Sequence, residues 1–190
     1  IASHQITPPP GTFLQATGES EKYIQDAVVK SLPAKLNRRD IITELYAGCG
    51  TLTFPLAEHA RVNAYEGYAP ALEALKKATG GTRISTFCRD LNHQPVLAKE
   101  IAASAVVVLD PPHAGAKLQM RQIAQGLPTH IIYVSCNPAA LAQDANLLAK
   151  AGYTVENVTV VDQFLWSAEI EAICSFKRES SRRSRNGLSR

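Results

Sequence analysis

Short apolar runs alternate with segments of helical periodicity along most of the chain, and this alternation restricts the possible folds most strongly. The apolar runs are nearly continuous, which is typical of strands that are buried on both sides. Strands are predicted at 41–46, 62–66, 83–87, 104–109, 129–134, 153–162 and 168–177, and helices at 51–59, 69–79, 94–102, 117–126 and 138–149, after a first helical segment that starts at Gly18. This order predicts an α/β fold, a doubly wound, mostly parallel seven-stranded sheet with helices on both faces.

The last two predicted strands follow each other without a helix, so a C-terminal β-hairpin is expected at one end of the sheet. We expect an extended segment at 1–17, where prolines oppose helix, one domain at 18–178, and a basic, disordered tail at 179–190. Residues 177–190 contain six Lys/Arg and one Glu, so the rest of the chain has 14 basic and 16 acidic residues. Such a tail suits a phosphate backbone, or is simply a solvated terminus.

Composition excludes several classes of protein. With 190 residues, 45% of them hydrophobic, the chain can bury one sizeable core. No apolar stretch approaches a membrane span, and the first residues lack the features of a signal peptide, so a cytoplasmic protein without a membrane partner is expected. Cys49, Cys88, Cys136 and Cys174 lie far apart without zinc-ligand spacing, which predicts thiols rather than disulfides and no metal site. Cys88 and Cys174 are interpreted as buried small residues.

Polar residues gather where the predicted strands end. In doubly wound sheets, ligands bind beyond the carboxyl ends of the strands. The strand ends carry Glu44, Tyr46, Gly48 and Gly50 after the first strand, Glu66 after the second, Asp90 after the third, Asp110-Pro-Pro-His113 after the fourth, and Ser135-Cys136-Asn137 after the fifth. All of these ends lie on one edge of the sheet, so this edge is the candidate site.

The Gly48-Cys49-Gly50 turn and Glu66 favour a nucleoside cofactor. Glycines at a strand-to-helix turn let a ligand approach the backbone, although a G-x-G alone is usually only a tight turn. Glu66 lies 18 residues beyond Gly48, where an acid can bind both hydroxyls of a ribose. No Gly-x-x-x-x-Gly-Lys loop is present in the sequence, so ATP hydrolysis is not expected.

Cys136 and the acids of the final hairpin raise the question of covalent chemistry. Cys136 stands between a buried strand and an Asn-Pro turn, where a thiol could be filler, a metal ligand or a nucleophile. Glu169 and Glu171 share one face of a strand by their spacing of two, with Ile170 between them expected to point inward. They could supply a base near the ligand, or form a solvated hairpin face, which is the simpler reading of the residues alone.

These motifs together resemble the catalytic domain of the RNA 5-methyluridine (uracil-C5) methyltransferase family. The resemblance rests on TFLQ (12–15), ELYAGCGTLTFPLA (44–57), YEG (65–67), LDPPHAG (109–115), YVSCNPAALAQD (133–144) and DQFLWSAEIEAI (162–173), in this order. It covers roughly residues 11–178 and implies a class I methyltransferase fold with S-adenosylmethionine as the methyl donor. Family members usually carry an RNA-binding barrel ahead of this domain.

The resemblance also implies roles for individual residues. Cys136 matches the nucleophile and Glu171 the base, while the cofactor contacts fall on Gln15, Tyr46, Thr51, Glu66 and Asp110, to which Gly48 and Asp90 are added from their place at the strand ends. Thr51 stands where the family often has Asn. Other departures are His113 and Gln143 in place of arginines, and Glu169 in place of a histidine.

The implied chemistry explains the need for a thiol. Uracil C5 is a poor nucleophile, and attack of the Cys136 thiolate on C6 turns C5 into an enolate carbon that can take the methyl group. Glu171 then removes the C5 proton, and elimination restores the thiolate. The target base must be unstacked from the RNA to reach the site. The expected enzyme is a monomer that acts on rRNA or tRNA.

Two other readings stay open. The first is an amino methyltransferase that uses Asp110-Pro-Pro-His113 without a covalent step. The second is a weakened homologue that binds RNA or cofactor without methylation, suggested by the changes at His113 and Glu169.

Overall fold

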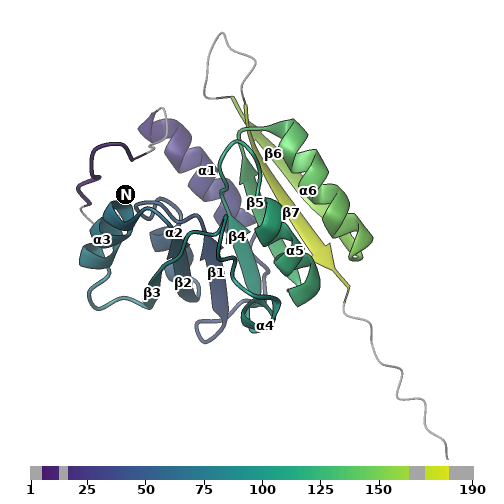
Figure 1. Cartoon of the computed structure of the whole chain (residues 1–190), viewed down its shortest axis with the longest axis horizontal. Coiled ribbons are helices and arrows are strands. Elements are labelled where there is room, and N and C mark those ends of the chain that lie inside the picture. Colours follow the sequence, from purple (N-terminus) through teal and green to yellow (C-terminus); the bar gives the residue numbers. More distant parts are fainter. Residues whose placement is uncertain (1–5, 13–16, 163–169, 180–190) are drawn as a thin grey trace, which may run out of the picture.

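The computed structural model describes residues 6–12, 17–162 and 170–179 (Figure 1). The helices are α1 (Gly18–Lys30), α2 (Thr53–Ala57), α3 (Ala69–Ala78), α4 (Ala98–Ile101), α5 (Lys117–Gly126) and α6 (Pro138–Lys150), and the strands are β1 (Ile41–Leu45), β2 (Arg61–Glu66), β3 (Ile84–Cys88), β4 (Val106–Leu109), β5 (His130–Ser135), β6 (Tyr153–Val161) and β7 (Glu171–Arg178). Strands and helices alternate as predicted, so the fold class is confirmed.

The seven strands form one sheet in the order β3-β2-β1-β4-β5-β7-β6. The first five strands pair in parallel, whereas β7 is antiparallel to both of its neighbours. The predicted terminal hairpin is therefore present, and its second strand lies inside the sheet (Figure 1, where β7 is the yellow arrow). Because β7 runs against β5, the start of β7 lies at the carboxyl edge of the parallel strands, with Ala172 opposite Ser135.

Alternate side chains of the central strands pack into two separate hydrophobic cores, one on each face of the sheet. On β5, Ile132 and Val134 face α1, α2 and α3, while Ile131 and Tyr133 face α4, α5 and α6. All four side chains are fully buried. This double burial explains why the strands read as continuous apolar runs instead of alternating ones.

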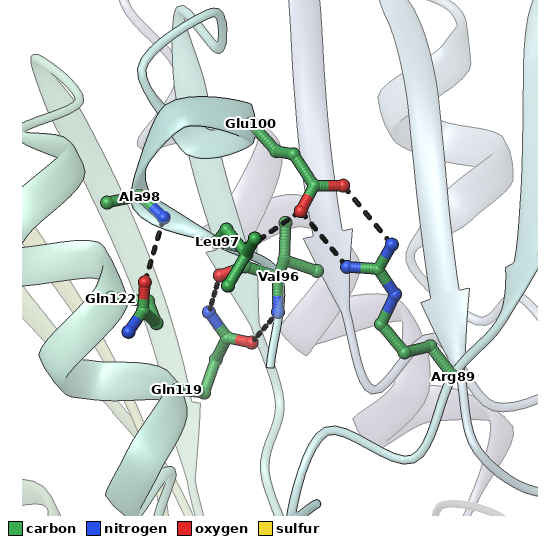
Figure 2. Close-up of polar contacts among 7 residues, drawn as sticks. All are labelled: Arg89, Val96, Leu97, Ala98, Glu100, Gln119 and Gln122. Carbon is green, nitrogen blue, oxygen red and sulfur yellow. Dashed lines mark hydrogen bonds and ion pairs between the residues drawn. The ribbon is translucent and has the colours of Figure 1, made fainter. Parts of the chain in front are cut away.

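Two glutamine side chains of α5 bind the backbone of the loop that leads from β3 to α4. The amide of Gln119, which is fully buried, accepts from Val96 N at 2.8 Å and donates to Val96 O at 3.1 Å, and Gln122 accepts from Ala98 N at 2.9 Å (Figure 2). The predicted helix at 94–102 is therefore wrong over its first turn: α4 begins only at Ala98, because Pro95 opposes helix and Val96 bonds to a side chain.

A charged pair closes the same loop. Arg89 forms two contacts of 3.2 Å with the two carboxylate oxygens of Glu100, and Glu100 also accepts from Leu97 N at 2.9 Å (Figure 2). The guanidinium of Arg89 also lies 5.2 Å from the ring centroid of Tyr65, within the range of a cation–π contact. These contacts fix the segment just beyond the carboxyl end of β3.

Among the described residues, none of the helices combines the length and the apolar character that a membrane crossing requires.

Candidate functional site

A cavity of about 550 Å³ opens at the carboxyl ends of the parallel strands, within the size range of small-molecule sites. The structure brings seven of the predicted site residues to its lining: Tyr46, Gly48, Thr51, Glu66, Asp110, Cys136 and Glu171. These residues come from the ends of β1, β2, β4 and β5 and from the start of β7. The cavity therefore lies where the topology of a doubly wound sheet places ligands.

The turn after β1 has a backbone that few residues adopt. Tyr46 has φ of +63°, and Gly48 and Gly50 have φ of +55° and +98°. A Cβ on Gly48 would meet no atom within 4 Å, whereas a Cβ on Gly50 would lie 2.6 Å from Leu75 Cδ1. Gly48 thus leaves open space beside the cavity, and Gly50 lets the turn pack closely on α3. The left-handed conformation of Tyr46, a side chain that rarely adopts it, is the kind of strain found at functional sites.

Glu66 connects this turn to the end of β2. One carboxylate oxygen accepts from Gly48 N at 2.7 Å and the other accepts from Tyr68 N at 2.7 Å. Each oxygen keeps a second lone pair, so the carboxylate can still accept hydrogen bonds from hydroxyl groups of a ligand. The backbone amides hold it in one orientation at the cavity wall.

Acidic side chains dominate the floor of the cavity. Glu44 is 3% exposed, and its Oε2 has no hydrogen-bond partner among the described residues. Burial, with the nearby carboxylates of Asp110 and Glu66, raises the pKa of Glu44 to about 8, against a smaller opposing effect of Thr53. Burial and the carboxylate of Glu171 raise the pKa of Asp110 to about 7. The cavity therefore stabilises a positively charged group and disfavours an anion.

Cys136 and Glu171 line the same cavity from adjacent strands of the sheet. Cys136 is half-buried directly after β5, between Ser135 and the N-cap residue of α6, Asn137. Glu171 is 3% exposed at the first position of β7. The simpler reading of Glu171 as part of a solvated hairpin face is therefore wrong, because β7 lies inside the sheet with β5 and β6 on either side.

Some residues that the sequence singles out cannot be assigned to the cavity. Gln15 and Glu169 lie outside the described residues. Asp90 does not line the cavity: its exposed carboxylate bonds to the His93 ring at 2.8 Å and to Asn92 N at 3.0 Å. The prediction that Cys88 is buried is wrong, since it is exposed at the end of β3, the edge strand of the sheet, whereas Cys174 is buried as predicted.

Sequence reasoning missed part of the lining. Glu44 is predicted to lie at this edge but is given no role, although an acid in a mostly apolar strand is a signal of function. Cys49 is 3% exposed and also lines the cavity, and burial raises the pKa of its thiol above the ordinary value, which disfavours the thiolate. Thr12 and Tyr68 add a wall from the N-terminal segment and the loop after β2, linked by a hydrogen bond of 3.1 Å from the Tyr68 hydroxyl to Pro10 O.

Outside this cavity, the described residues offer no metal site, and one larger hollow lacks the predicted residues. In the part of the chain that the structure describes, no cluster of three or more His, Cys, Asp or Glu side chains could hold a metal ion. A larger hollow of about 1400 Å³ lies between the end of α1 and strands β6 and β7, and none of the predicted site residues line it.

A family described as tRNA (uracil-5-)-methyltransferase matches residues 71–179, a range that includes both Cys136 and Glu171. A protein of Caulobacter vibrioides named "Uncharacterized RNA methyltransferase" is 46% identical over 174 residues, which cover 90% of this chain and 41% of that protein. The 23S rRNA (uracil(1939)-C(5))-methyltransferase RlmD of Halomonas elongata is 32% identical over 188 residues, with 95% and 39% covered. The chain thus spans about 40% of the length of these relatives.

Among solved structures, a Pyrococcus abyssi tRNA (uracil-54, C5)-methyltransferase in complex with S-adenosyl-L-homocysteine has the same fold. The TM-score is 0.74 at 22% identity, and the match covers 88% of this chain and 40% of that one.

Proposed function

This chain belongs to the tRNA (uracil-5-)-methyltransferase family, and on that basis we propose that it transfers a methyl group from S-adenosylmethionine to C5 of a uridine in RNA. The observation that carries the proposal is the shared cavity: a half-buried thiol, Cys136, and a buried carboxyl group, Glu171, line it together with the glycine turn and Glu66. The names of two relatives describe methyltransferases of 23S rRNA and of tRNA, which supports RNA as the substrate.

The cavity has the chemistry that this cofactor requires. S-adenosylmethionine, when bound, supplies an electrophilic methyl group on a positively charged sulfonium. Four acids, Glu44, Glu66, Asp110 and Glu171, line the cavity, and a cation bound there would favour their ionised forms, which in turn attract it. Glu66 is held by Gly48 and Tyr68 at the end of β2, where it can accept from both ribose hydroxyls. The volume of about 550 Å³ is suited to a ligand of this size.

Two protein residues then act on the uracil base, one as nucleophile and one as general base. The Cys136 thiolate adds to C6 of the uracil ring, which makes C5 nucleophilic. Once C5 carries the methyl group, Glu171 removes the C5 proton, the C5=C6 double bond reforms, and the S–C6 bond breaks to restore the thiolate. Burial and the nearby carboxylate of Glu171 raise the pKa of Asp110 to about 7, so Asp110 can hold a proton while Glu171 acts as the base.

RNA that contains 5-fluorouridine tests the covalent step. Fluorine at C5 cannot leave as a proton would, so the protein and the RNA should remain linked in the presence of S-adenosylmethionine. Mass analysis of the digested complex should place the link on Cys136. Transcripts of tRNA and of 23S rRNA, compared in the same assay, identify the class of RNA.

Matched variants make the test specific. Cys136→Ala should abolish the link, and Cys88→Ala, an exposed cysteine outside the cavity, should leave it unchanged. With ordinary uridine, Glu171→Gln should accumulate a methylated adduct because the C5 proton is not removed. Turnover that persists in Cys136→Ala would reject the covalent mechanism, and methylation of an exocyclic nitrogen would favour an amino methyltransferase.

A further inference from the structure

The loop between β4 and α5 is attached to α6 at two points. Near the start of α6, Asn137 Nδ2 donates to His113 O at 2.9 Å. About two turns further along the helix, Asp144 Oδ2 accepts from Ala116 N at 2.9 Å. The loop thus runs along the N-terminal half of α6, held once at each end of that half.

The second attachment is a buried carboxyl group. Asp144 is 6% exposed, and the same Oδ2 accepts from the hydroxyl of Tyr133 at 2.7 Å. Burial and Asp144 raise the pKa of Tyr133 above its ordinary value, so the phenol keeps its proton and remains a donor. The same buried oxygen thus accepts from Ala116 N and from the Tyr133 hydroxyl, which suits Asp144 to hold a turn of backbone in place.

The loop has no room to move towards α6. Gly115 has φ of +78°, and a Cβ at this position would lie 3.0 Å from Asp144 Oδ2 and 3.3 Å from Ala140 Cβ. The turn therefore packs closely against the carboxylate and the helix, and its positive φ favours glycine there. Loss of the carboxylate would remove both the hydrogen bond and the surface on which the turn rests.

Residues next to the two attachments line the cavity. Pro111, Pro112 and His113, on the loop, line the cavity, and so does Cys136, which immediately precedes the N-cap of α6. Asn137 is itself fixed, since its Oδ1 accepts from Ala139 N at 3.0 Å and its backbone bonds with the Ser135 hydroxyl. The distance between the loop wall and the thiol is thus governed by how the loop sits on α6.

We propose that Asp144 is a positioning residue: it locks the 110–116 loop onto α6 and thereby sets the gap between His113 and Cys136 into which the target base must fit. The catalytic part of this inference rests on the proposed function. Asp144 does not line the cavity, so its effect is exerted through the loop.

Three variants separate positioning from a general structural role. Asp144→Ala removes both hydrogen bonds, Asp144→Asn keeps an acceptor oxygen, and Tyr133→Phe removes only the hydroxyl while the bond to Ala116 remains. The rate of adduct formation with 5-fluorouridine RNA should fall at least tenfold in Asp144→Ala, recover partly in Asp144→Asn, and stay within about threefold of wild type in Tyr133→Phe. The KM for RNA should change less than kcat, because Asp144 does not line the cavity.

Hydrogen exchange gives a readout that does not depend on the reaction. The amides of Gly115 and Ala116 should exchange at least tenfold faster in Asp144→Ala but not in Tyr133→Phe. If the wild type forms no adduct, the proposed function fails, and the exchange data alone decide on Asp144. The inference is overturned if Asp144→Ala leaves these amides protected, or if adduct formation falls equally in Asp144→Ala and Tyr133→Phe.

Discussion

Replacement of Glu44 by glutamine should make the protein more stable at high pH. The pKa of this carboxyl is about 8 in the folded protein and 4.5 as its ordinary value, so between these values the folded state holds a proton that the unfolded state has lost. Raising the pH through this range therefore lowers the free energy of unfolding, by at most about 1.4 kcal/mol per pH unit. The glutamine amide in Glu44→Gln does not titrate in this range, so the contribution of position 44 to the pH dependence of stability disappears.

The size of the change follows from the neighbouring acid. Asp110 has its pKa raised from 3.8 to about 7, so it contributes in the same direction over most of the same range. Where both groups titrate, the free energy of unfolding should fall by up to roughly 2.7 kcal/mol per pH unit in the wild type, and by about half of that in Glu44→Gln.

Urea unfolding from about pH 5 to about pH 9 measures both slopes, with the slope against urea held as a check on two-state behaviour. Glu58→Gln, which removes an exposed carboxylate, is the matched control for the loss of one negative charge. Equal pH slopes in wild type and Glu44→Gln would show that Glu44 is ionised in the folded cavity, and the account of an acidic, proton-holding floor would then be wrong.

Three further changes test other contacts. Gln119→Leu should lower the free energy of unfolding by about 2–4 kcal/mol, because it strands two buried backbone groups, and Gln122→Leu, which breaks one partly buried bond, should cost less in the same urea titration. Gly50→Ala should cost roughly 1–3 kcal/mol, since the Cβ would lie 2.6 Å from Leu75 Cδ1, and an unchanged melting temperature would contradict that packing. Glu66→Gln should weaken binding of S-adenosylhomocysteine about tenfold by calorimetry and cost about 1 kcal/mol of stability, because its amide keeps one of the two acceptor oxygens, and wild-type affinity would remove Glu66 from the cofactor site.

The sheet could be predicted from sequence because its signal is local. Apolar runs such as 106–109 read as buried strands from composition alone, and the hairpin follows from the missing helix between the last two strands. The order of strands could not be read, because it depends on whether β6 or β7 pairs with β5. Glu171 is buried because β7 lies between β5 and β6. Since the sequence does not show this order, the residue is equally consistent with a solvated hairpin face.

Polar side chains that act at a distance were the hardest to predict. Asp144 and Gln119 lie on helices, where a polar residue is usually solvated, and their partners, Ala116 and Val96, lie 28 and 23 residues away. The prediction that Cys88 is buried is wrong because the sequence pattern shows a strand but does not show that this strand forms the edge of the sheet. The site residues at strand ends were easier to find because topology alone gathers them.

The inside position of β7 also determines when the site can come into being. During synthesis on the ribosome, β6 emerges before β7. Among the described strands β6 pairs only with β7, so β6 cannot join the sheet until β7 has been made. Until β7 inserts, the edge of β5 stays open, and the thiol at position 136 has no carboxylate opposite it. A nascent chain therefore brings Cys136 and Glu171 together only when β7 has inserted between β5 and β6.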